Sequence, residues 1–327
     1  MRRREFIMLL GGAVAWPIAA RAQQQGRVPR IGVLWHAANA EEEGPLFTGL
    51  VEGFKKLGYV DGRNIVLEHR FPNEIPERFK SMAVELVSMK VDALVSAGTV
   101  AALTIKDTTK TIPLVFMFIP DPMGSKLVDS LAHPGGNITG LANFAPDLIG
   151  KRLQLLKEII PGMSRLALLI NPNSQISPVY INVTRGAAAA LGVGVQTYEA
   201  RSLDDIGRAF EAMTRAGMQA VSINADGLVY QAKDIIAKLA IERRMALSAY
   251  SQETFDAGAL LSYGPDNIAT THRAAVLVDK ILKGAKPSEL PVEQPTKFQF
   301  LINLKIAKAL DLEVPATLRA VADQVVN

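Results

Sequence analysis

Short polar side chains recur in this chain directly after apolar runs that are typical of buried β-strands. Their hydroxyl, amide and carboxylate groups can hold a small polar solute through hydrogen bonds, and charge strengthens some of these bonds. In open parallel sheets, ligands bind beyond the carboxyl ends of the strands, where loops and helix N-termini converge. The polar side chains at such positions are Thr99, Asp121, Asn173, Ser174 and Asp226.

Two of these residues suggest complementary chemistry. Thr99 follows Gly98 where a strand passes into a helix, so its hydroxyl and the free helix N–H groups suit a carboxylate. The alternative is an ordinary helix cap, in which Thr99 serves only its own helix. Asp121 lies between two prolines after an apolar strand, where it could hold an ammonium or hydroxyl group or simply stabilise a turn.

The second half of the chain offers the opposing half of such a site. Asn173 and Ser174 follow one strand and Asp226 follows another, so together they could complete the set of polar side chains that hydrogen-bond to the solute. Aromatic rings near strand ends could stack on a cyclic solute, although such rings more often pack in a core. Trp35 is the strongest candidate among the aromatic residues, and the others are Phe118, Tyr230 and Tyr250.

The sequence contains no pattern that is typical of catalysis or of a bound cofactor. It has no cysteine, which excludes disulfides, thiolate metal sites and cysteine nucleophiles. Its four histidines lack metal-ligand spacing, and there is no nucleophile elbow, P-loop or dinucleotide-binding glycine pattern. We therefore expect neither an enzyme nor a cofactor or metal site.

The first 22 residues have the features of a secretory signal peptide. Three arginines at positions 2–4 precede a short apolar stretch, which ends in the A-x-A sequence at 20–22. The paired arginines also fit the twin-arginine signals of exported proteins. The alternative is an uncleaved membrane anchor, but the apolar stretch is shorter than the ~20 residues of a spanning helix. We expect cleavage after Ala22 and a periplasmic location.

Net charge gives no indication of nucleic-acid binding. The whole chain has a formal charge of +4, from 36 basic and 32 acidic residues. Removing residues 1–22 takes away four arginines and one glutamate, which leaves a charge of +1. Because no stripe of lysine and arginine remains, we expect no nucleic-acid partner.

The loops that carry the polar side chains need sheets to position them. Uncharged apolar runs alternate with amphipathic stretches over residues 31–143, and the same rhythm starts again at 147. Such runs suit parallel strands covered on both faces, so the rhythm predicts an α/β fold with two doubly wound parallel-sheet lobes. The expected strands are 31–35, 64–71, 92–97, 113–119, 138–143, 165–170, 194–199, 219–224, 245–250 and 259–263, and the expected helices are 43–57, 76–89, 99–107, 147–160, 178–191, 204–215, 228–242 and 266–283, before a strand–helix unit at 298–310.

The C-terminal segments are expected to complete both lobes. The chain is expected to cross between the lobes three times, and these three crossings would form a hinge. They lie near 138–145, 259–265 and 286–297. The expected organisation is a signal peptide at 1–22, lobe 1 at 23–143 plus 264–290, and lobe 2 at 144–263 plus 291–327.

Several stretches of the chain resemble one known family. They are RRREFIMLLGGAVAWPIAARAQ, IGVLW, GLVEGFKKLGYVDGRNIVLEHRF, IPLVFMFIPDPMGSKLVDSLAHPGGNITGL, GKRLQLLKEIIPGMSRLALLINPN, and LSYGPD followed by KILKGAKPSELPVEQPTKFQFLINLKIAKAL. Over essentially the whole chain, they resemble ABC transporter substrate-binding proteins of the type I periplasmic-binding fold, some of which bind aromatic or other amino acids. The resemblance implies a monomeric receptor whose lobes close on a small molecule and then dock on a membrane permease.

The resemblance says more about the cleft side of the first half of the chain than about that of the second half. It places Asp121 at the cleft. The sequence Asp226-Gly227-Leu228 departs from relatives that carry an Asp-Asn-Thr-like loop, so amino-acid specificity does not follow directly.

Three alternatives share much of this description. A periplasmic sensor would present the bound solute to a membrane receptor, and the sequence does not separate it from a transport receptor. An exported two-lobed enzyme would need a catalytic constellation, which the sequence lacks. A repressor-type regulator would need a helix-turn-helix before the first lobe, where the signal-like segment lies instead.

Overall fold

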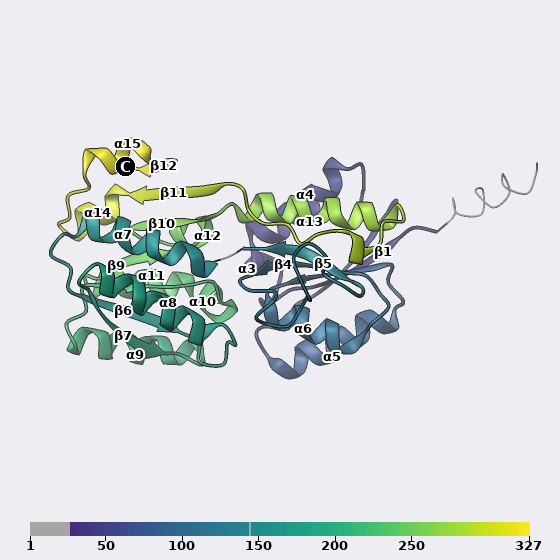
Figure 1. The fold of residues 1–327 in the computed structure, drawn as a ribbon, viewed down its shortest axis with the longest axis horizontal. Helices are drawn as coiled ribbons and strands as arrows, with labels where there is room; N and C mark the ends of the chain where they lie inside the picture. Colours follow the sequence, from purple (N-terminus) through teal and green to yellow (C-terminus); the bar gives the residue numbers. More distant parts are fainter. Residues whose placement is uncertain (1–26, 144) are drawn as a thin grey trace, which may run out of the picture.

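Two α/β lobes lie side by side in the computed structural model (Figure 1). The structure describes residues 27–143 and 145–327, so the expected signal peptide lies outside the described residues. The first lobe is built on a five-stranded sheet and the second on a seven-stranded sheet. We call them lobe 1 and lobe 2. The predicted fold class, two doubly wound α/β lobes, is confirmed.

The sheet of lobe 1 has the strand order β2-β1-β3-β4-β5, and all of its neighbouring strands are parallel. Its central strands consist almost entirely of apolar residues that are buried on both faces, as parallel sheets require. The strands are β1 (Arg30–Leu34), β2 (Val66–Arg70), β3 (Ala93–Ala97), β4 (Leu114–Ile119) and β5 (Ile138–Ala142).

Helices cover both faces of the lobe 1 sheet. Helices α4 (Pro45–Lys56) and α13 (Asn267–Leu282) pack on one face, and α5 (Pro76–Ser88) and α6 (Thr99–Thr108) pack on the other. Helix α13 therefore joins this lobe from far along the sequence. It packs closely on α4 because Gly53 leaves no side chain between the two helices, and a Cβ there would lie 2.9 Å from the Cα of His272.

The sheet of lobe 2 repeats this order as β7-β6-β8-β9-β10 and extends it with β11 and β12. Strand β11 is antiparallel to β10, which the sequence pattern did not indicate. The cause is the path of the chain: β10 leads out of lobe 2 into α13 of lobe 1, and β11 leads back. The strands are β6 (Arg165–Ile170), β7 (Gly194–Glu199), β8 (Ala220–Ser222), β9 (Ala246–Ala249), β10 (Leu261–Pro265), β11 (Phe298–Asn303) and β12 (Gln324–Val326).

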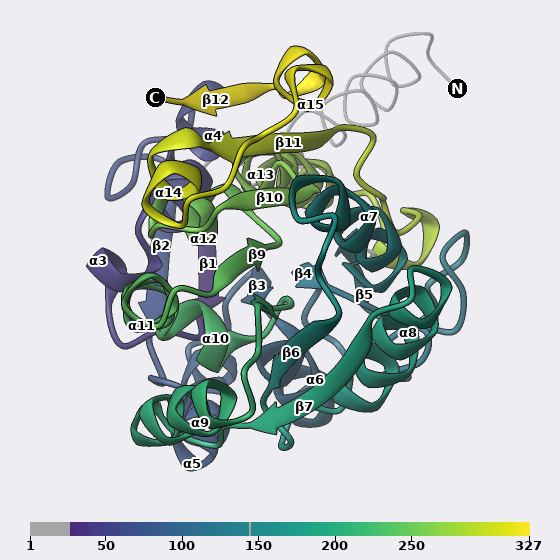
Figure 2. The same cartoon turned by 90° about the vertical axis from the view of Figure 1, so that its left-hand side faces the viewer.

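The helices of lobe 2 also form two layers (Figure 2). Helices α7 (Ile149–Ile159), α8 (Ser177–Ala190) and α14 (Leu304–Ala309) cover one face, and α9 (Leu203–Arg215) and α11 (Lys233–Glu242) cover the other. The helix expected over 228–242 is interrupted at Ala232, so a separate short helix, α10 (Gly227–Gln231), precedes α11. The remaining short elements are α3 (Ala40–Glu43), α12 (Gln252–Asp256), α15 (Ala316–Val321) and the 3-10 turns η1 (Ala145–Leu148) and η2 (Pro287–Glu289).

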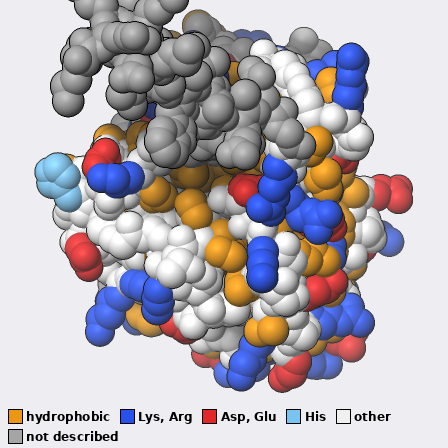
Figure 3. Space-filling view, turned by 90° about the vertical axis from the view of Figure 1, so that its right-hand side faces the viewer, with side chains coloured by type: hydrophobic (Ala, Val, Ile, Leu, Met, Phe, Trp, Pro, Cys, Tyr) orange, Lys and Arg blue, Asp and Glu red, His pale blue; other side chains and the backbone are white. Residues whose placement is uncertain are grey.

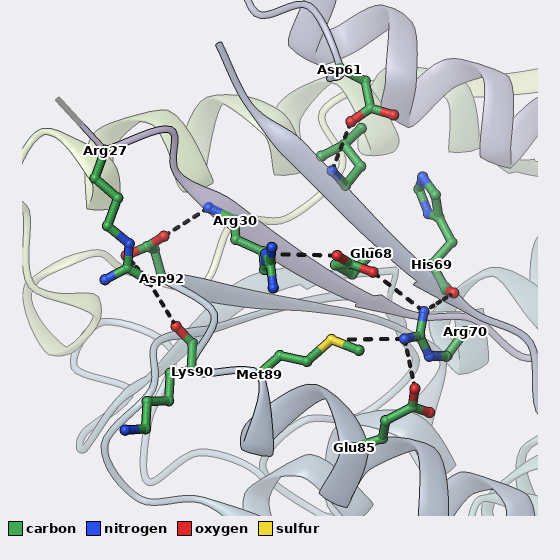
Figure 4. A network of polar contacts seen from close by, with 11 residues as sticks. Arg27, Arg30, Asp61, Glu68, His69, Arg70, Glu85, Met89, Lys90 and Asp92 are labelled. Atoms are coloured by element: carbon green, nitrogen blue, oxygen red, sulfur yellow. Dashed lines mark hydrogen bonds and ion pairs between the residues drawn. The ribbon is translucent and has the colours of Figure 1, made fainter. Parts of the chain in front are cut away.

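The outer edge of lobe 1 carries a network of charged side chains (Figure 4). Glu68 on the edge strand β2 lies 3.7 Å from both Arg30 and Arg70, and Arg70 also pairs with Glu85 at 2.8 Å. These partly exposed pairs contribute little to stability, but charges on an edge strand oppose pairing with another chain. The end of lobe 1 that lies away from lobe 2 likewise shows side chains of both charges, with apolar side chains between them (Figure 3).

Gly264, at the end of β10 where the chain leaves lobe 2, gives a test of this arrangement. A Cβ there would lie 1.7 Å from the carbonyl oxygen of Tyr250. We expect Gly264→Ala to separate β10 from the end of β9 and to destabilise the protein by about 2 kcal/mol or more, measured by urea unfolding. The control is Gly207→Ala on α9, which meets nothing within 4 Å and should be neutral or stabilising. Equal stability of the two variants would contradict the close approach.

Candidate functional site

The carboxyl ends of both sheets contain a topological switch point. In the order 2-1-3-4-5, the connections from the first and third strands lead to opposite faces of the sheet, which leaves a crevice between their loops. In lobe 1 this crevice lies between the segments that follow β1 and β3, at 35–39 and 98–99. In lobe 2 it lies between the segments that follow β6 and β8, at 171–176 and 223–226.

Helix α10 connects the two crevices, because it follows β8 of lobe 2 and contacts lobe 1. The hydroxyl of Tyr230 donates to the backbone oxygen of Glu43 at 3.1 Å. The side-chain amide of Gln231 donates to Asn73 at 2.6 Å. The His36 and Tyr230 rings lie with their centroids 5.2 Å apart. The strand-end loops of the two lobes are therefore in direct contact.

Glu43 organises the lobe 1 side of this contact. Its side chain is fully buried, and one carboxylate oxygen accepts the backbone N–H groups of His36 at 2.9 Å and Ala37 at 2.8 Å. The imidazole Nδ1 of His36 lies 3.1 Å from the same oxygen. Burial alone would lower the pKa of His36, but the Glu43 carboxylate outweighs it and raises this pKa to about 9. The pair is therefore ionised at neutral pH.

Glu74 lies at the same contact in an unusual backbone conformation. Asn73 and Glu74 both have positive φ angles, 57° and 54°. Their N–H groups donate to the backbone oxygens of Ala37 and His36 at 3.0 and 2.9 Å, which holds the turn against the loop after β1. A Cβ at Gly227 would lie 1.8 Å from a Glu74 carboxyl oxygen, so this carboxyl group packs directly on the start of α10.

The surroundings of Glu74 favour its protonated form. Burial is the main cause that raises the pKa of Glu74, to about 7. The negative charges of Asp226 and Glu43 raise it further, whereas the positive charge of His36 opposes them. The lobe contact therefore contains a carboxyl group that takes up a proton near neutral pH.

The expected site residues of lobe 2 lie close together. Asn171, after β6, donates its side-chain amide toward both carboxylate oxygens of Asp226 at 3.4 Å, across the switch point. Asp226 also caps α10 through the N–H of Val229 at 3.2 Å. Asn173 is exposed and bonded through its backbone to Asn171, and Ser174 lies near Asp226, whose pKa burial raises. The structure thus brings these loop residues together around Asp226.

The expected site residues of lobe 1 are less concentrated. Thr99 is the first residue of α6 and is partly exposed, after Gly98 at a φ of 83°. One carboxylate oxygen of Asp121 accepts the N–H of Gly124 at 2.7 Å and so closes a turn. Trp35 is fully buried, and its indole N–H donates to His69 at 3.0 Å. Burial lowers the pKa of His69 to about 4, which leaves it neutral and able to accept this bond.

Trp35 is thus a core residue in the described state. Its ring stacks on Phe71 at a centroid distance of 6.4 Å and lies near Phe47 at 5.8 Å. In this arrangement the ring supports the loop after β1 and is not exposed toward the other lobe.

Arg152 was not among the expected site residues. Its side chain is fully buried on α7, and one terminal N–H group donates to the side-chain oxygen of Asn224, directly after β8. Within the described residues, its Nε and its other terminal nitrogen have no hydrogen-bond partner. Burial lowers the pKa of Arg152 to about 10, which still leaves it charged at neutral pH. The sequence did contain a signal of this burial, because Arg152 lies on the same helix face as the apolar residues Leu153 and Leu156.

Buried polar atoms without a protein partner occur on both sides of the lobe contact. In lobe 1 they are a carboxylate oxygen of Glu43 and the hydroxyl of Ser96, at the end of β3. In lobe 2 they include the side-chain nitrogen of Asn224 and a carboxylate oxygen of Glu253, at the start of α12. Such atoms are costly to bury unless something hydrogen-bonds to them. The arrangement therefore suits the binding of a small polar molecule.

Two kinds of feature are absent from the part of the chain that the structure describes. No three His, Asp or Glu side chains there are grouped to hold a metal ion. No helix within 27–143 or 145–327 is long and apolar enough to span a bilayer.

Comparison with known proteins agrees with this geometry. A family model described as ABC transporter substrate binding protein matches residues 42–326. A protein named tyrosine-binding protein, from Clostridioides difficile strain R20291, is 25% identical over 266 residues, which cover 81% of this chain and 76% of that protein. A conserved domain protein from Vibrio cholerae has a TM-score of 0.85 at 25% identity, covering 91% of this chain and 100% of that one.

Two further structures share this fold. A domain from Streptococcus pneumonia in complex with L-Trp has a TM-score of 0.85 at 24% identity, over 92% of this chain and 100% of that one. A ligand-free, open substrate binding protein from Clostridium difficile has a TM-score of only 0.66 at the same identity, over 92% and 99%.

The surroundings of Glu74 predict how the stability of the folded protein depends on pH. A raised carboxyl pKa means that the folded protein binds the proton more tightly than the unfolded chain does, so stability falls as pH rises from about 4.5 to about 7. The pKa of His36 is also raised, from 6.5 to about 9, so its titration lowers stability further as pH rises through this range. We expect Glu74→Gln, which stays neutral, to lose about 2–4 °C less of its melting temperature than wild type between pH 5 and 7.5.

The charged groups that face Glu74, namely His36, Glu43 and Asp226, are present in both proteins, so their own titration largely cancels in this comparison. Glu77→Gln, at an exposed position at the start of α5, should keep the wild-type pH profile. Parallel profiles for wild type and Glu74→Gln would contradict the role assigned to Glu74.

Proposed function

The chain belongs to the ABC transporter substrate binding protein family, and on that premise we propose that it captures one amino-acid-like solute between its lobes and delivers it to an ABC importer. One observation carries the proposal. Buried polar atoms that lack a protein partner lie on both sides of the contact between the lobes, as expected where a solute provides the missing hydrogen bonds.

The solute class follows from the relatives and from the charges at the site. The relatives described above include a tyrosine-binding protein and an L-Trp complex. In this chain, Glu43 and Glu253 offer carboxylate oxygens that suit an ammonium group. The rings of Tyr230 and Tyr250, buried nearby in lobe 2, offer apolar surface for a side chain. An aromatic amino acid combines these features.

The loop residues that we assign to the site come from both lobes. Thr99 and Asp121 of lobe 1 and Asn173, Ser174 and Asp226 of lobe 2 all follow strands at the carboxyl ends of the two sheets. Trp35 acts indirectly, by supporting the loop after β1. We take lobe 1 as 23–143 plus 264–290 and lobe 2 as 144–263 plus 291–327, so that the three connections between them form the hinge.

Substrate-binding proteins of ABC importers act outside the cytoplasm. We propose that this one is a periplasmic monomer, exported through a cleaved signal at residues 1–22 whose paired arginines direct it to the twin-arginine route. Solute binds to the open form, and its contacts to the second lobe favour closure by a population shift.

A screen of mature protein, residues 23–327, tests the proposed function. A solute that binds only the folded state raises the melting temperature by mass action. We expect aromatic amino acids to raise it at millimolar concentration, whereas sugars and nucleosides should not. No shift with any amino acid would contradict the proposed solute class, and consumption of a solute would indicate an enzyme.

Tyr230→Phe tests whether closure contributes to affinity. The substitution removes the hydroxyl that donates to Glu43 across the lobes at 3.1 Å and keeps the ring. Because a neutral hydrogen bond contributes about 1 kcal/mol, we expect the Kd for the solute to rise about fivefold in calorimetry. The matched control is Tyr263→Phe on β10, a tyrosine that packs against Phe298 within lobe 2. A Kd that is unchanged, or raised equally in both variants, would argue against binding by closure.

A further inference from the structure

Arg152 differs from the other arginines of the protein in its environment. Arg70 pairs with Glu85 at 2.8 Å, and Arg273 pairs with Glu293 through two nitrogens, and all four side chains are partly exposed. Arg152 is fully buried, and no carboxylate within the described residues pairs with it. Removing a cation from water without a counter-charge is strongly unfavourable. Such a residue needs an anion that the described protein does not supply.

The nearest titratable side chains do not neutralise Arg152. Tyr180 and Tyr250 are the groups whose charge would act on it. Burial raises the pKa of both tyrosines well above the usual range, so both stay uncharged. In addition, the hydroxyl of Tyr180 donates a hydrogen bond to the backbone oxygen of Ala225 at 3.0 Å. Asn224 supplies a neutral oxygen to one nitrogen only.

Arg152 lies at the carboxyl end of the lobe 2 sheet, close to the lobe contact. Helix α7, which carries it, begins directly after the first connection between the lobes and packs over β9 and β10. Its partner Asn224 follows β8, two residues before Asp226. The buried Tyr250 lies near both Arg152 and Tyr230, and Tyr230 reaches Glu43 of lobe 1. Arg152 therefore faces the region where strand ends of both lobes meet.

We propose that Arg152 is the anion-binding residue of the cleft and that it holds the carboxylate of the solute with the N–H groups that have no partner within the described residues. The inference rests on the proposed function, since it concerns the same cleft. Guanidinium groups bind carboxylates with paired, charge-assisted hydrogen bonds, which fix the orientation of the bound group. The free carboxylate oxygen of Glu43 then takes the ammonium group of the same molecule. Burial raises the pKa of Glu253, so its free oxygen adds a second acceptor once the ammonium group favours the ionised form. A zwitterionic α-amino acid meets both requirements, whereas a sugar or a free amine meets only one or neither.

Two probes that differ only at the carboxylate test this assignment. L-tryptophan and L-tryptophanamide share the ring and the ammonium group, and only the first carries a carboxylate. Because the amide leaves the buried guanidinium unpaired, we expect wild type to bind L-tryptophan at least about 100-fold more tightly in calorimetry. Arg152→Met, which keeps the length of the side chain without its charge, should reduce this ratio to about threefold or less.

Ligand-free stability separates anion binding from a structural role. Replacing a buried, unpaired charge by an apolar side chain is neutral or stabilising, so ligand-free Arg152→Met should melt at or above the wild-type temperature. A structural arginine would instead leave a less stable protein. The control is Arg185→Met at an exposed position on α8, which should keep both the stability and the 100-fold ratio.

The possible outcomes distinguish this inference from the function on which it rests. A ratio that stays near 100 in Arg152→Met, or a marked loss of ligand-free stability, would overturn the assignment and leave solute capture standing. Binding by wild type only of solutes without a carboxylate, in the same calorimeter, would do the same. Failure of wild type to bind any amino acid, sugar or nucleoside would overturn both.

Discussion

The buried carboxylate of Glu43 is the interaction on which the cleft side of lobe 1 depends. It ends the short helix α3, yet its side chain points back to accept two N–H groups of the loop after β1 and to pair with His36. That loop in turn provides the backbone oxygens that hold Asn73 and Glu74 in their positive-φ turn. Two strand-end loops are thus fixed by one buried charge, whose cost of burial is offset by an imidazolium and two N–H donors.

The buried charge of lobe 2 lacks such partners. Arg152 has one neutral partner, Asn224, and N–H groups that have no partner within the described residues. The charges of Glu43 and His36 thus cancel within lobe 1, whereas the charge of Arg152 in lobe 2 has no counter-charge paired with it among the described residues. Between the strand-end loops of the two lobes, the described residues form a few hydrogen bonds, including those of Tyr230 and Gln231, and no ion pair. With so little direct attraction between the lobes, closure must gain most of its free energy from the solute.

The sequence predicted the architecture well because apolar runs and strand order are local or nearly local properties. The uncharged strands β3 and β4 and the amphipathic helix α9 were each located within one or two residues. A strand was expected at β11, but its antiparallel direction was not predicted, because it depends on how the chain passes between the lobes. The break between α10 and α11 was not predicted either. The family was likewise identified from the sequence, and the twin-arginine signal remains a prediction.

The residues of the site were harder to predict than the loops that carry them. Loop position follows from strand order, so polar residues at strand ends such as Asp226 and Asn173 were recognisable. Glu43 looks like a favourable charge in the first turn of a helix, and nothing in its neighbours along the chain shows that it is fully buried. Arg152 is a cation on an otherwise apolar helix face, which is a pattern that the sequence shows. The same pattern also fits an arginine whose side chain extends to solvent.

The charges on the two sides of the cleft constrain what the closed form can hold. The charges of His36 and Glu43 cancel within lobe 1, and Glu74 accepts a proton where it packs against α10, which limits repulsion from Asp226. The positive charge of Arg152 then remains unbalanced in a region of low dielectric constant. A neutral solute would leave that charge in place, and a cation would add to it. A zwitterion places its carboxylate at Arg152 and its ammonium group at the free carboxylate oxygens, so it satisfies both lobes in a single closed state.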